Sequence, residues 1–194
     1  FMTGDDLIEF VNIKLFPYLK SFRESASSAD TLEYKIGEIF SEIQNSIKSG
    51  YILRDVINII NGMKFQTSEE RHELSYFYED KIMKMGNSGR AGGEYYTPRP
   101  LIRTIIKIIK PQIGEKIYDG ACGSAGFLVE AYDYLNKLEV NMSEGEKYNI
   151  LQKKTLYGQE FKPLPYVIGI MNMILHGINA PNILPDDAKV TAIP

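Results

Sequence analysis

Apolar residues recur at every third or fourth position along the first part of the chain, which is the spacing of one face of an α-helix. This pattern predicts helices over "DLIEFVNIKLFPYLKSF" (6–22), "TLEYKIGEIFSEIQNSIK" (31–48) and "YILRDVINIINGM" (51–63). A further helix begins at a candidate capping box, Thr67 and Glu70 in "TSEE". Its apolar side chains are predicted to share one inward face, formed by Leu74, Phe77, Tyr78, Ile82 and Met85.

The stretch "GNSGRAGG" (86–93) separates this helical part from the remainder, and its glycines predict a linker or loop. Residues 1–87 are therefore predicted to form an all-helical domain. No group of titratable residues typical of catalysis stands in it, so its expected role is packing or contact with partners. Residues 88–194 are predicted to form a second domain.

Strand and helix patterns alternate after the linker. Thr97 is predicted to cap a helix that has Pro98 at its first position and continues to Pro111. The elements that follow are a strand over 115–119, a helix over 125–138, a strand over 154–160, a helix over 165–177 and a strand over 182–187. This alternation predicts an α/β fold, a parallel Rossmann-like sheet with helices on its faces.

Composition sets limits on the function. The chain has 194 residues, 44% of them hydrophobic, so it is long enough to build a sizeable core. A net charge of −3 is unlike that of a protein that holds nucleic acid by itself. The single cysteine excludes a disulfide framework and a cysteine-rich metal cluster, and it fits a reducing cytoplasm. Apolar runs fall short of a membrane span, and no signal-peptide pattern opens the chain.

Candidate chemistry lies where the first strand of the second domain ends. Asp119 closes that strand, and the turn after it contains Gly123 and Gly126 before the next helix begins. In a parallel sheet, ligands bind outside the carboxyl ends of the strands, and glycine allows a ligand to approach the backbone. The helix offers unpaired N–H groups to an anionic group. Glu160 ends the next strand, where a carboxylate can accept hydrogen bonds from both hydroxyls of a ribose.

The charge of Asp119 distinguishes between two nucleotide cofactors. A dinucleotide site has the pattern G-x-G-x-x-G, with an acidic residue roughly twenty positions later. Here the pattern reads Ala121-x-Gly123-x-x-Gly126, and Glu160 lies about twice that far along the chain. Asp119 would also repel a pyrophosphate, whereas it suits an ammonium or sulfonium group. These features favour S-adenosylmethionine over NAD.

Three stretches of the chain resemble one family. The stretches "GGEYYTPRPLIRTII", "DGACGSAGFL" and "LYGQE" are similar to the modification subunits of type I restriction–modification systems, whose usual text is GEFYTPR, DPACGSGGFL and YGQE. The resemblance covers about residues 68–180, in the family's order and spacing. It implies a DNA adenine-N6 methyltransferase that uses S-adenosylmethionine and protects host DNA from restriction. The first part of the chain resembles the end of that family's N-terminal helical domain.

The resemblance also implies a cofactor site without a metal. The segment 94–98 matches the part that folds over the methionine end of the cofactor, and Asp119 is expected to face its amino group. Glu160 matches the acceptor of the ribose hydroxyls, and Asp186 or its neighbour Asp187 is expected to hold the adenine amino group, since either could end the third strand. The full set of expected cofactor-binding residues is Glu94, Tyr95, Tyr96, Thr97, Pro98, Asp119, Ala121, Gly123, Ser124, Gly126, Phe127, Glu160 and Asp186. Phe127 has an equally good interpretation as a core residue.

The sequence departs from the family pattern at several points. Gly120 replaces a proline, and Ala125 replaces a glycine, which adds one methyl group to the loop. The catalytic text, similar to N-P-P-F, is absent, and "PLPY" (163–166) begins a predicted helix, where a structural role is expected. The chain is therefore expected to be a fragment that is inactive alone and whose catalytic motif lies beyond Pro194. The implied partners are double-stranded DNA, a specificity subunit and a restriction (nuclease) subunit; no membrane partner is expected.

Two other functions stay open at the level of the sequence. They are a non-catalytic module that binds a cofactor or docks a partner, and an NAD-dependent oxidoreductase. Cys122 has no His or Asp in motif spacing, which favours a packed small residue over a nucleophile. His176 stands at a predicted helix end, where it can cap carbonyl groups, and neither it nor His72 has a metal-ligand partner in the sequence.

Overall fold

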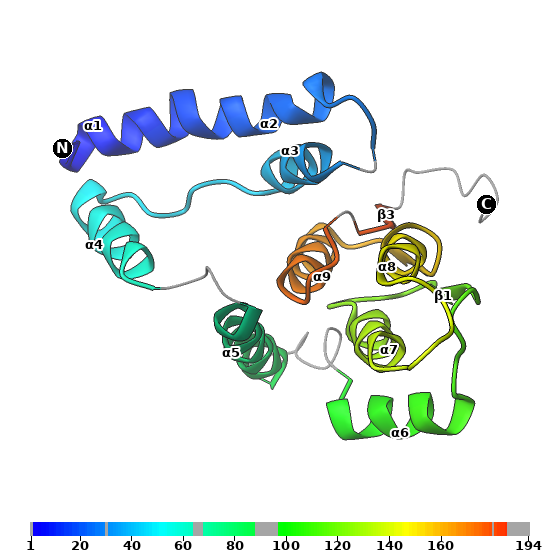
Figure 1. The fold of residues 1–194 in the computed structure, drawn as a ribbon. Coiled ribbons are helices and arrows are strands. Elements are labelled where there is room, and N and C mark those ends of the chain that lie inside the picture. The colour runs from blue at the N-terminus through cyan, green and yellow to red at the C-terminus, as the bar shows by residue number, and fades with distance from the viewer. Residues whose placement is uncertain (1, 30, 64–67, 88–96, 180, 186–194) are drawn as a thin grey trace. The chain divides into compact units, whose positions relative to one another are not determined.

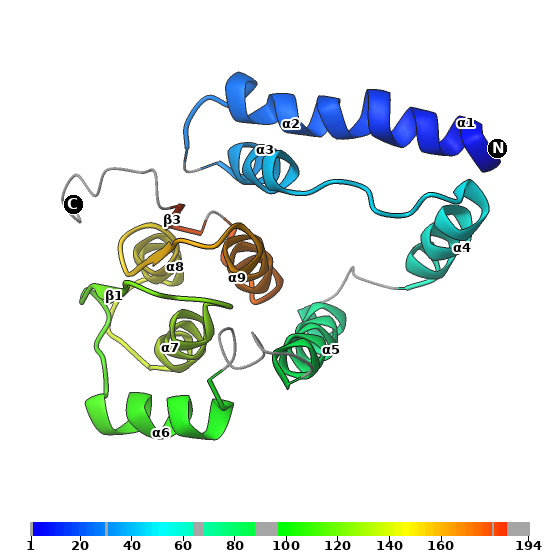
Figure 2. The same ribbon diagram turned by 180° about the vertical axis from the view of Figure 1, so that it is seen from behind.

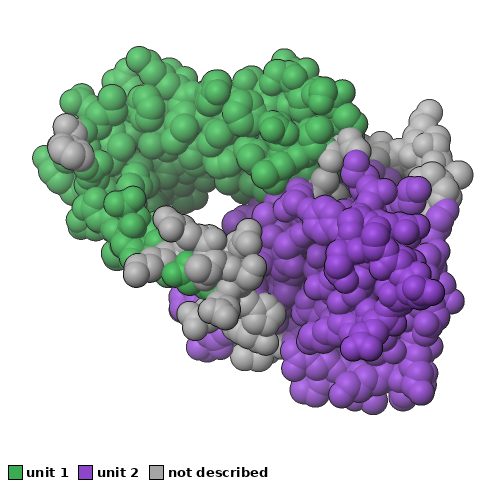
Figure 3. Space-filling model, in the orientation of Figure 1, with its two compact units in different colours: residues 1–71 green, residues 72–194 purple. Residues whose placement is uncertain are grey.

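The computed structural model describes residues 2–29, 31–63, 68–87, 97–179 and 181–185. The chain groups into two compact units, residues 1–71 and 72–194 (Figure 3). Within the described residues, no helix has both the length and the apolar character that crossing a membrane requires. The predicted linker over 86–93 lies outside the described residues from position 88 onward.

The first unit contains the helices that the apolar spacing predicts. They are α1 (Gly4–Glu9), the π-helical segment η1 (Phe10–Leu15), α2 (Phe16–Ser25), α3 (Leu32–Glu42) and α4 (Gly50–Asn61) (Figure 1). Leu7, Val11 and Leu53 form a buried cluster that joins the start of the chain to α4. Helices α2 and α3 approach closely at Gly37, where a Cβ would lie 2.2 Å from the backbone nitrogen of Arg23.

The π-helical segment has a local cause in the sequence. Pro17 has no N–H group and cannot close an α-helical turn onto the carbonyl four residues earlier. Directly before it, the Phe16 N–H bonds to the carbonyl of Val11, five residues back, which is the π-helical pattern. This wider turn accommodates the proline, and the helix continues into α2. The single helix predicted over 6–22 is therefore confirmed, with a local change of winding.

The helix predicted over 31–48 ends earlier than expected, at Glu42. Ile43 is already extended, with φ −103° and ψ 150°. Asn45 explains the early end, because its side-chain oxygen accepts the Ile47 N–H at 2.9 Å and its amide group donates to Asn12 at 3.1 Å. Asparagine side chains compete with helical hydrogen bonds in this way.

The second unit alternates helices and strands. After α5 (Ser68–Asn87) come α6 (Arg99–Ile109), β1 (Ile117–Asp119), α7 (Gly126–Asn136), α8 (Glu144–Lys153), β2 (Leu156–Glu160), α9 (Pro163–Leu175) and β3 (Ile183–Pro185). The strands form one sheet in the order β1-β2-β3, and each neighbouring pair is parallel. The predicted α/β fold with a parallel sheet is confirmed.

Helices α7 and α9 cover the same face of this sheet. Helix α7 packs on β1 and β2, α9 packs on β2 and β3, and the two helices contact each other, as both ribbon views show (Figures 1 and 2). Their contact face is fully buried at Leu128, Leu135 and Ile170. Burying such a side chain contributes about 1.5–3 kcal/mol. Helix α6 packs against α7 and thereby brings the start of α6 close to the loop after β1.

The start of α6 differs from the prediction. Thr97 is not the N-cap; Pro98 occupies that position with extended ψ (127°), and no side chain caps the helix. The carbonyl of Pro98 accepts the N–H groups of Leu101 and Ile102, at 3.0 and 3.3 Å, so the helix begins one residue later than expected. Thr97 precedes a proline, and a residue in that position is pushed towards extended backbone. The predicted end before Pro111 is confirmed, because Lys110 turns into the left-handed region (φ 51°).

Helix α8 was not predicted. Ser143 caps its start, since the Ser143 hydroxyl accepts the backbone N–H of Glu146 at 3.2 Å. The pattern Ser-x-x-Glu in "SEGE" (143–146) is the signal that could have identified this helix. Lys147 in its first turn reaches back to α7 and donates to the carbonyls of Asn136 and Leu138, at 2.7 and 2.8 Å.

Helix α5 buries part of its predicted face, since Leu74 and Tyr78 are half-buried and Ile82 is buried, whereas Phe77 departs from the prediction. Phe77 is 53% exposed, whereas Ser75 and Ile82 are buried. Residues 75, 78, 79 and 82 form the inward stripe, because Tyr78 donates to the Ile168 carbonyl at 3.4 Å and Glu79 pairs with Arg99. From residue 72 onward this helix belongs to the second compact unit. The domain division at 87/88 stays a prediction. The identity of the two parts as helical and methyltransferase domains stays a prediction.

Candidate functional site

Two acidic residues lie together at the carboxyl edge of the sheet. Asp119 ends β1 and pairs in register with Gly158, so Glu160 lies two residues further along the neighbouring strand β2. The loop over 120–125 runs beside them from β1 into α7. The sequence prediction of a strand, a tight turn and a helix with an acid at the end of each strand is confirmed.

Glu160 holds this loop in place. Its Oε2 accepts the Gly123 N–H at 2.8 Å, and its Oε1 accepts the Lys162 N–H at 2.9 Å. One half-buried carboxylate therefore ties the loop after β1 to the segment after β2. Each carboxylate oxygen has more than one lone pair. Glu160 thus keeps acceptor capacity for the hydroxyl groups of a ligand.

Asp119 is half-buried, and its surroundings disfavour the ionised form of its carboxylate. Its Oδ1 accepts the Ala121 N–H at 3.2 Å. Burial raises the pKa of Asp119, the Ala121 hydrogen bond opposes that rise, and the negative charge of Glu160 adds to it. A cationic group placed beside Asp119 would stabilise the ionised carboxylate. A pyrophosphate would do the opposite.

The backbone of the loop is tightly wound. The Cys122 N–H donates to the Gln159 carbonyl at 3.0 Å, and the Ala125 N–H donates to the Cys122 carbonyl at 2.7 Å. Gly123 and Ala125 both have left-handed φ, of 52° and 59°. This conformation costs alanine about 1–2 kcal/mol, while the fully buried methyl group contributes roughly 0.8 kcal/mol in return. Burial of the methyl group therefore offsets part of the conformational cost of alanine at this position.

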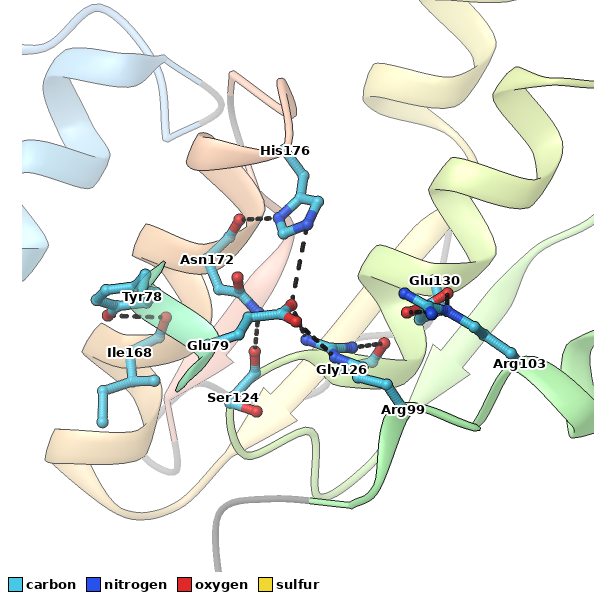
Figure 4. A network of polar contacts seen from close by, with 10 residues as sticks. All are labelled: Tyr78, Glu79, Arg99, Arg103, Ser124, Gly126, Glu130, Ile168, Asn172 and His176. Carbon is cyan, nitrogen blue, oxygen red and sulfur yellow. Dashed lines mark hydrogen bonds and ion pairs between the residues drawn. The ribbon is translucent and has the colours of Figure 1, made fainter. Parts of the chain in front are cut away.

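Polar side chains hold the same loop from the interior (Figure 4). Arg99 donates to the Gly126 carbonyl at 2.6 Å, and the side chain of Asn172 donates to the Ser124 carbonyl at 2.8 Å. The space around the loop is tight at two glycines: a Cβ at Gly126 would lie 2.9 Å from Arg99 Nη1, and one at Gly169 would lie 2.8 Å from the Gly123 carbonyl oxygen. Sequence reasoning assigned no role to Arg99 or Asn172.

Cys122 is a packed residue, as predicted. It is 6% exposed, and its sulfur lies against β2 at Gly158. Burial, followed by the negative charges of Asp119 and Glu160, raises the pKa of the Cys122 thiol to about 12. A thiol in this state is not an effective nucleophile at neutral pH. His176 caps α9 as expected, with Nδ1 at 2.9 Å from the Asn172 carbonyl.

The structure brings together only some of the expected cofactor-binding residues. Those in one loop or at its edge are Asp119, Ala121, Gly123, Ser124, Gly126, Phe127 and Glu160. Thr97 and Pro98 are exposed and directly precede Arg99, which bonds to this loop. Phe127 is half-buried, between its two interpretations. Glu94, Tyr95, Tyr96, Asp186 and Asp187 lie outside the described residues, so their predicted roles are untested.

Metal-ligating side chains do not gather in the part of the chain that the structure describes. No group of three or more His, Cys, Asp or Glu residues there is placed to hold an ion. The site is instead a glycine turn flanked by two carboxylates, with the start of α7 beside it. Chemically, this arrangement can accept hydrogen bonds from hydroxyl groups and attract a positively charged group.

Comparison with known proteins points to one family. The model of the family described as N-6 DNA Methylase matches residues 69–189. The methylase subunit of the type I restriction enzyme EcoEI from Escherichia coli is 40% identical over 180 residues, which are 93% of this chain and 36% of that protein. The methylase subunit of MjaIX from Methanocaldococcus jannaschii is 35% identical over 127 residues, covering 66% of this chain and 21% of that protein.

Solved structures agree with these sequence matches. A modification subunit of a putative type I restriction enzyme from Vibrio vulnificus YJ016 superposes with a TM-score of 0.81 at 38% identity, covering 95% of this chain and 40% of that one. A structure described for complex assembly and conformational transition of the type I R-M system gives a TM-score of 0.77 at 41% identity, covering 93% and 36%. The chain thus spans well under half the length of the proteins it matches.

Proposed function

The chain belongs to the N-6 DNA Methylase family, and on that premise we propose that the full-length protein is the modification subunit of a type I restriction–modification system. In this proposal it transfers a methyl group from S-adenosylmethionine to the N6 amino group of adenine in host DNA. The observation that carries the proposal is the pair of carboxylates, Asp119 and Glu160, flanking a glycine turn that Glu160 itself holds. Family membership argues against the nicotinamide oxidoreductase alternative.

The described residues fit S-adenosylmethionine by their charge. Glu160 would accept the ribose hydroxyl groups through the lone pairs that its backbone contacts leave available. Asp119, whose pKa is raised by burial and by the charge of Glu160, would be stabilised by the positively charged methionine end. On the resemblance alone, the proposal extends the site to Glu94, Tyr95, Tyr96 and Asp186.

The part played by this chain is binding and orientation. When bound, the cofactor would supply a methyl group activated by the sulfonium sulfur: the N6–C bond would form as the C–S bond breaks, the neutral thioether would leave, and the amine would lose a proton. The loop residues and Glu160 would fix the position of that methyl group, and a fixed geometry removes much of the entropic barrier to transfer. The adenine must leave the duplex stack to reach such a site. Residues similar to N-P-P-F, which would hold the adenine amine, are not in this sequence.

The proposed partners follow from the same assignment. They are double-stranded DNA, a specificity subunit that selects the DNA sequence, and a restriction (nuclease) subunit. The proposed place of action is the cytoplasm. The net charge of −3 supports a division of labour in which DNA contact is shared with other subunits.

Calorimetry on Glu160→Gln tests the proposal. A glutamine offers one oxygen, whereas Glu160 accepts two backbone N–H groups, so its amide nitrogen would face an N–H donor. We expect S-adenosylmethionine to bind about 10- to 100-fold more weakly, the usual cost of a charged hydrogen-bond acceptor. Glu115→Gln is the matched control, because the hydrogen bond that the Glu115 carboxylate accepts from the Gln112 N–H can be kept by the amide oxygen.

Wild-type protein should bind S-adenosylmethionine and not NAD in the same experiment. Equal cofactor affinity of wild type and Glu160→Gln would contradict the assignment of Glu160 to the site. Binding of NAD in preference to S-adenosylmethionine would overturn the proposed function.

A further inference from the structure

A buried ion pair lies behind the loop after β1. Arg99 and Glu79 have side chains only 7% and 12% exposed, and they come from α6 and α5. Arg99 Nε donates to Glu79 Oε2 at 3.0 Å, and its Nη2 donates to Glu79 Oε1, which makes the pair two-pronged. His176 of α9 also approaches, with Nε2 at 3.9 Å from Glu79 Oε1 (Figure 4).

The third guanidinium nitrogen of Arg99, Nη1, takes no part in the ion pair with Glu79 and bonds to the backbone of the loop instead. Nη1 donates to the carbonyl of Gly126, the first residue of α7, at 2.6 Å. This carbonyl stands at the end of the loop that contains Gly123 and Ser124. A planar guanidinium with a fixed fork of donors can bond a carboxylate and a carbonyl at once, whereas a lysine ammonium has no such fork.

Asn172 of α9 holds the same loop from a second direction. Its side chain is fully buried, and its Nδ2 donates to the Ser124 carbonyl at 2.8 Å. The carbonyls at 124 and 126 are therefore both anchored from the interior, while Glu160 anchors the N–H at 123. The first N–H groups of a helix have no partner within that helix. Fixing these carbonyls therefore fixes the direction in which the start of α7 offers its N–H groups.

We propose that Arg99, oriented by Glu79, is a positioning residue that sets the backbone of residues 123–126 for the bound cofactor. Asn172 assists it at Ser124. The inference rests on the proposed function, because it assigns to this loop the binding of S-adenosylmethionine. Through Glu79, the conformation of the loop also depends on how α5 is seated.

The same helices provide a matched control. Arg103 of α6 pairs with Glu130 of α7, Nε to Oε1 and Oε2, at 2.9 and 3.0 Å. It lies one turn further along α6 and is 51% exposed (Figure 4). These contacts join Arg103 to α7 at Glu130. Arg99→Lys and Arg103→Lys therefore make the same chemical change in an arginine–glutamate pair. The change at Arg99 affects the pair that contacts the loop, whereas the change at Arg103 affects a pair between α6 and α7.

The experiment compares full-length wild type, Arg99→Lys, Arg103→Lys and the double variant Glu79→Leu/Arg99→Met. The double variant removes the bond to Gly126 without leaving a buried charge, which protects the fold. Three quantities are measured: the Kd for S-adenosylmethionine by calorimetry, the amide hydrogen exchange of residues 121–126 without cofactor, and the Tm. We expect Arg99→Lys and the double variant to bind at least about tenfold more weakly and to exchange faster in the loop, because a small displacement of binding groups is costly. Arg103→Lys should match wild type.

Each outcome decides the matter. A merely structural ion pair would lower the Tm without changing the Kd or the loop exchange of the folded protein. Equal Kd and loop exchange in Arg99→Lys and Arg103→Lys would therefore overturn the proposal. If Arg99→Lys does not fold, the double variant decides by the same criteria. If wild type binds no S-adenosylmethionine, the proposed function fails, and loop exchange in the cofactor-free protein alone supports or overturns the positioning role.

Discussion

At the scale of single residues, the site places two carboxylates side by side around a turn with little room for side chains. Glu160 is satisfied by two backbone N–H groups, whereas Asp119 accepts one. Burial raises the pKa of Asp119, and the charge of Glu160 acts in the same direction. A carboxylate whose pKa is raised in this way is typical of a site that binds a ligand of opposite charge.

Asp119→Asn should have opposite effects on stability and on binding. The folded-state pKa of Asp119 lies above the unfolded value, so folding favours the protonated carboxyl. Its contribution to stability is present below the unfolded pKa, about 4, and is lost as the pH rises through the folded pKa. The neutral amide avoids that loss and keeps an oxygen for the Ala121 N–H. We expect a higher Tm than wild type at pH 7, and cofactor binding weaker by about 2 kcal/mol.

Thermal unfolding at pH 4 and pH 7, with calorimetry at pH 7, measures both effects. The Tm advantage of Asp119→Asn should shrink at pH 4, where the wild-type carboxyl is itself partly protonated. An advantage of the same size at both pH values would show that the charge of Asp119 is not its cause. Unchanged cofactor affinity would remove Asp119 from the site.

Cys122 should be unreactive in the folded protein. Its thiol is buried, and burial with the charges of Asp119 and Glu160 raises its pKa to about 12. Since the thiolate is the reactive form, labelling by a thiol reagent at pH 8 should be far slower than in urea-unfolded protein. The measurement is the rate of absorbance change with a disulfide reagent. Equal rates in the folded and unfolded protein would contradict the buried placement.

At the scale of elements, the connection between β1 and β2 contains two helices, α7 and α8. Side chains form hydrogen bonds with the backbone at the end of α7 and at the start of α8. Ser143 caps the start of α8, and Lys147 of α8 donates to the carbonyls of Asn136 and Leu138 after α7. These contacts satisfy backbone groups that helix ends leave unpaired. They seat α8 against α7 and hence influence where β2 begins.

Ser143→Ala should lower the free energy of unfolding by about 1 kcal/mol, since the hydroxyl that accepts the Glu146 N–H is lost. Ser143→Asp should restore most of the stability, because aspartate is an equally good N-cap. Thr104→Ala is the control: Thr104 is exposed, and its hydroxyl donates to the Pro100 carbonyl within α6 without capping a helix. Urea denaturation measures all three. A loss in Thr104→Ala as large as in Ser143→Ala would contradict the capping role.

At the scale of the whole molecule, side chains on the two faces of the sheet differ in their exposure within the described residues. Leu156 and Ile183 are buried beneath the helices, whereas Tyr118 and Leu184, on the opposite face, are 46% and 40% exposed. Doubly wound sheets carry helices on both faces. The chain also spans only 36% of its Escherichia coli relative.

Residues 1–194 alone should therefore not methylate DNA. The sequence contains nothing similar to N-P-P-F to hold the adenine amine. Exposed apolar side chains on the open sheet face should also promote self-association. The measurement is transfer of labelled methyl from S-adenosylmethionine to DNA, with the full-length protein and its specificity subunit as the positive control. Transfer by residues 1–194 alone would show that another group in this chain positions the amine.

The sequence by itself determined the elements and the chemistry at their ends. Helical spacing, alternation of strands and helices, and the glycine turn after Asp119 are local properties, and most elements appear where these patterns place them. Asp119 and Glu160 could be assigned to one edge because the carboxyl ends of parallel strands meet there. Helix α8 had a readable signal as well, in Ser143 and Glu146.

Only the tertiary structure decided which polar groups become partners. Glu79 and Arg99 are 20 positions apart, and Asn172 and Ser124 are 48 apart, so no local pattern links them. The apolar pattern of α5 did not indicate Glu79 for the same reason, since a charged residue turns inward when an opposite charge meets it there. The local periodicity of apolar residues indicates which face of a helix or strand is buried. The choice of a buried hydrogen-bond partner depends on which distant segments the packed fold brings together.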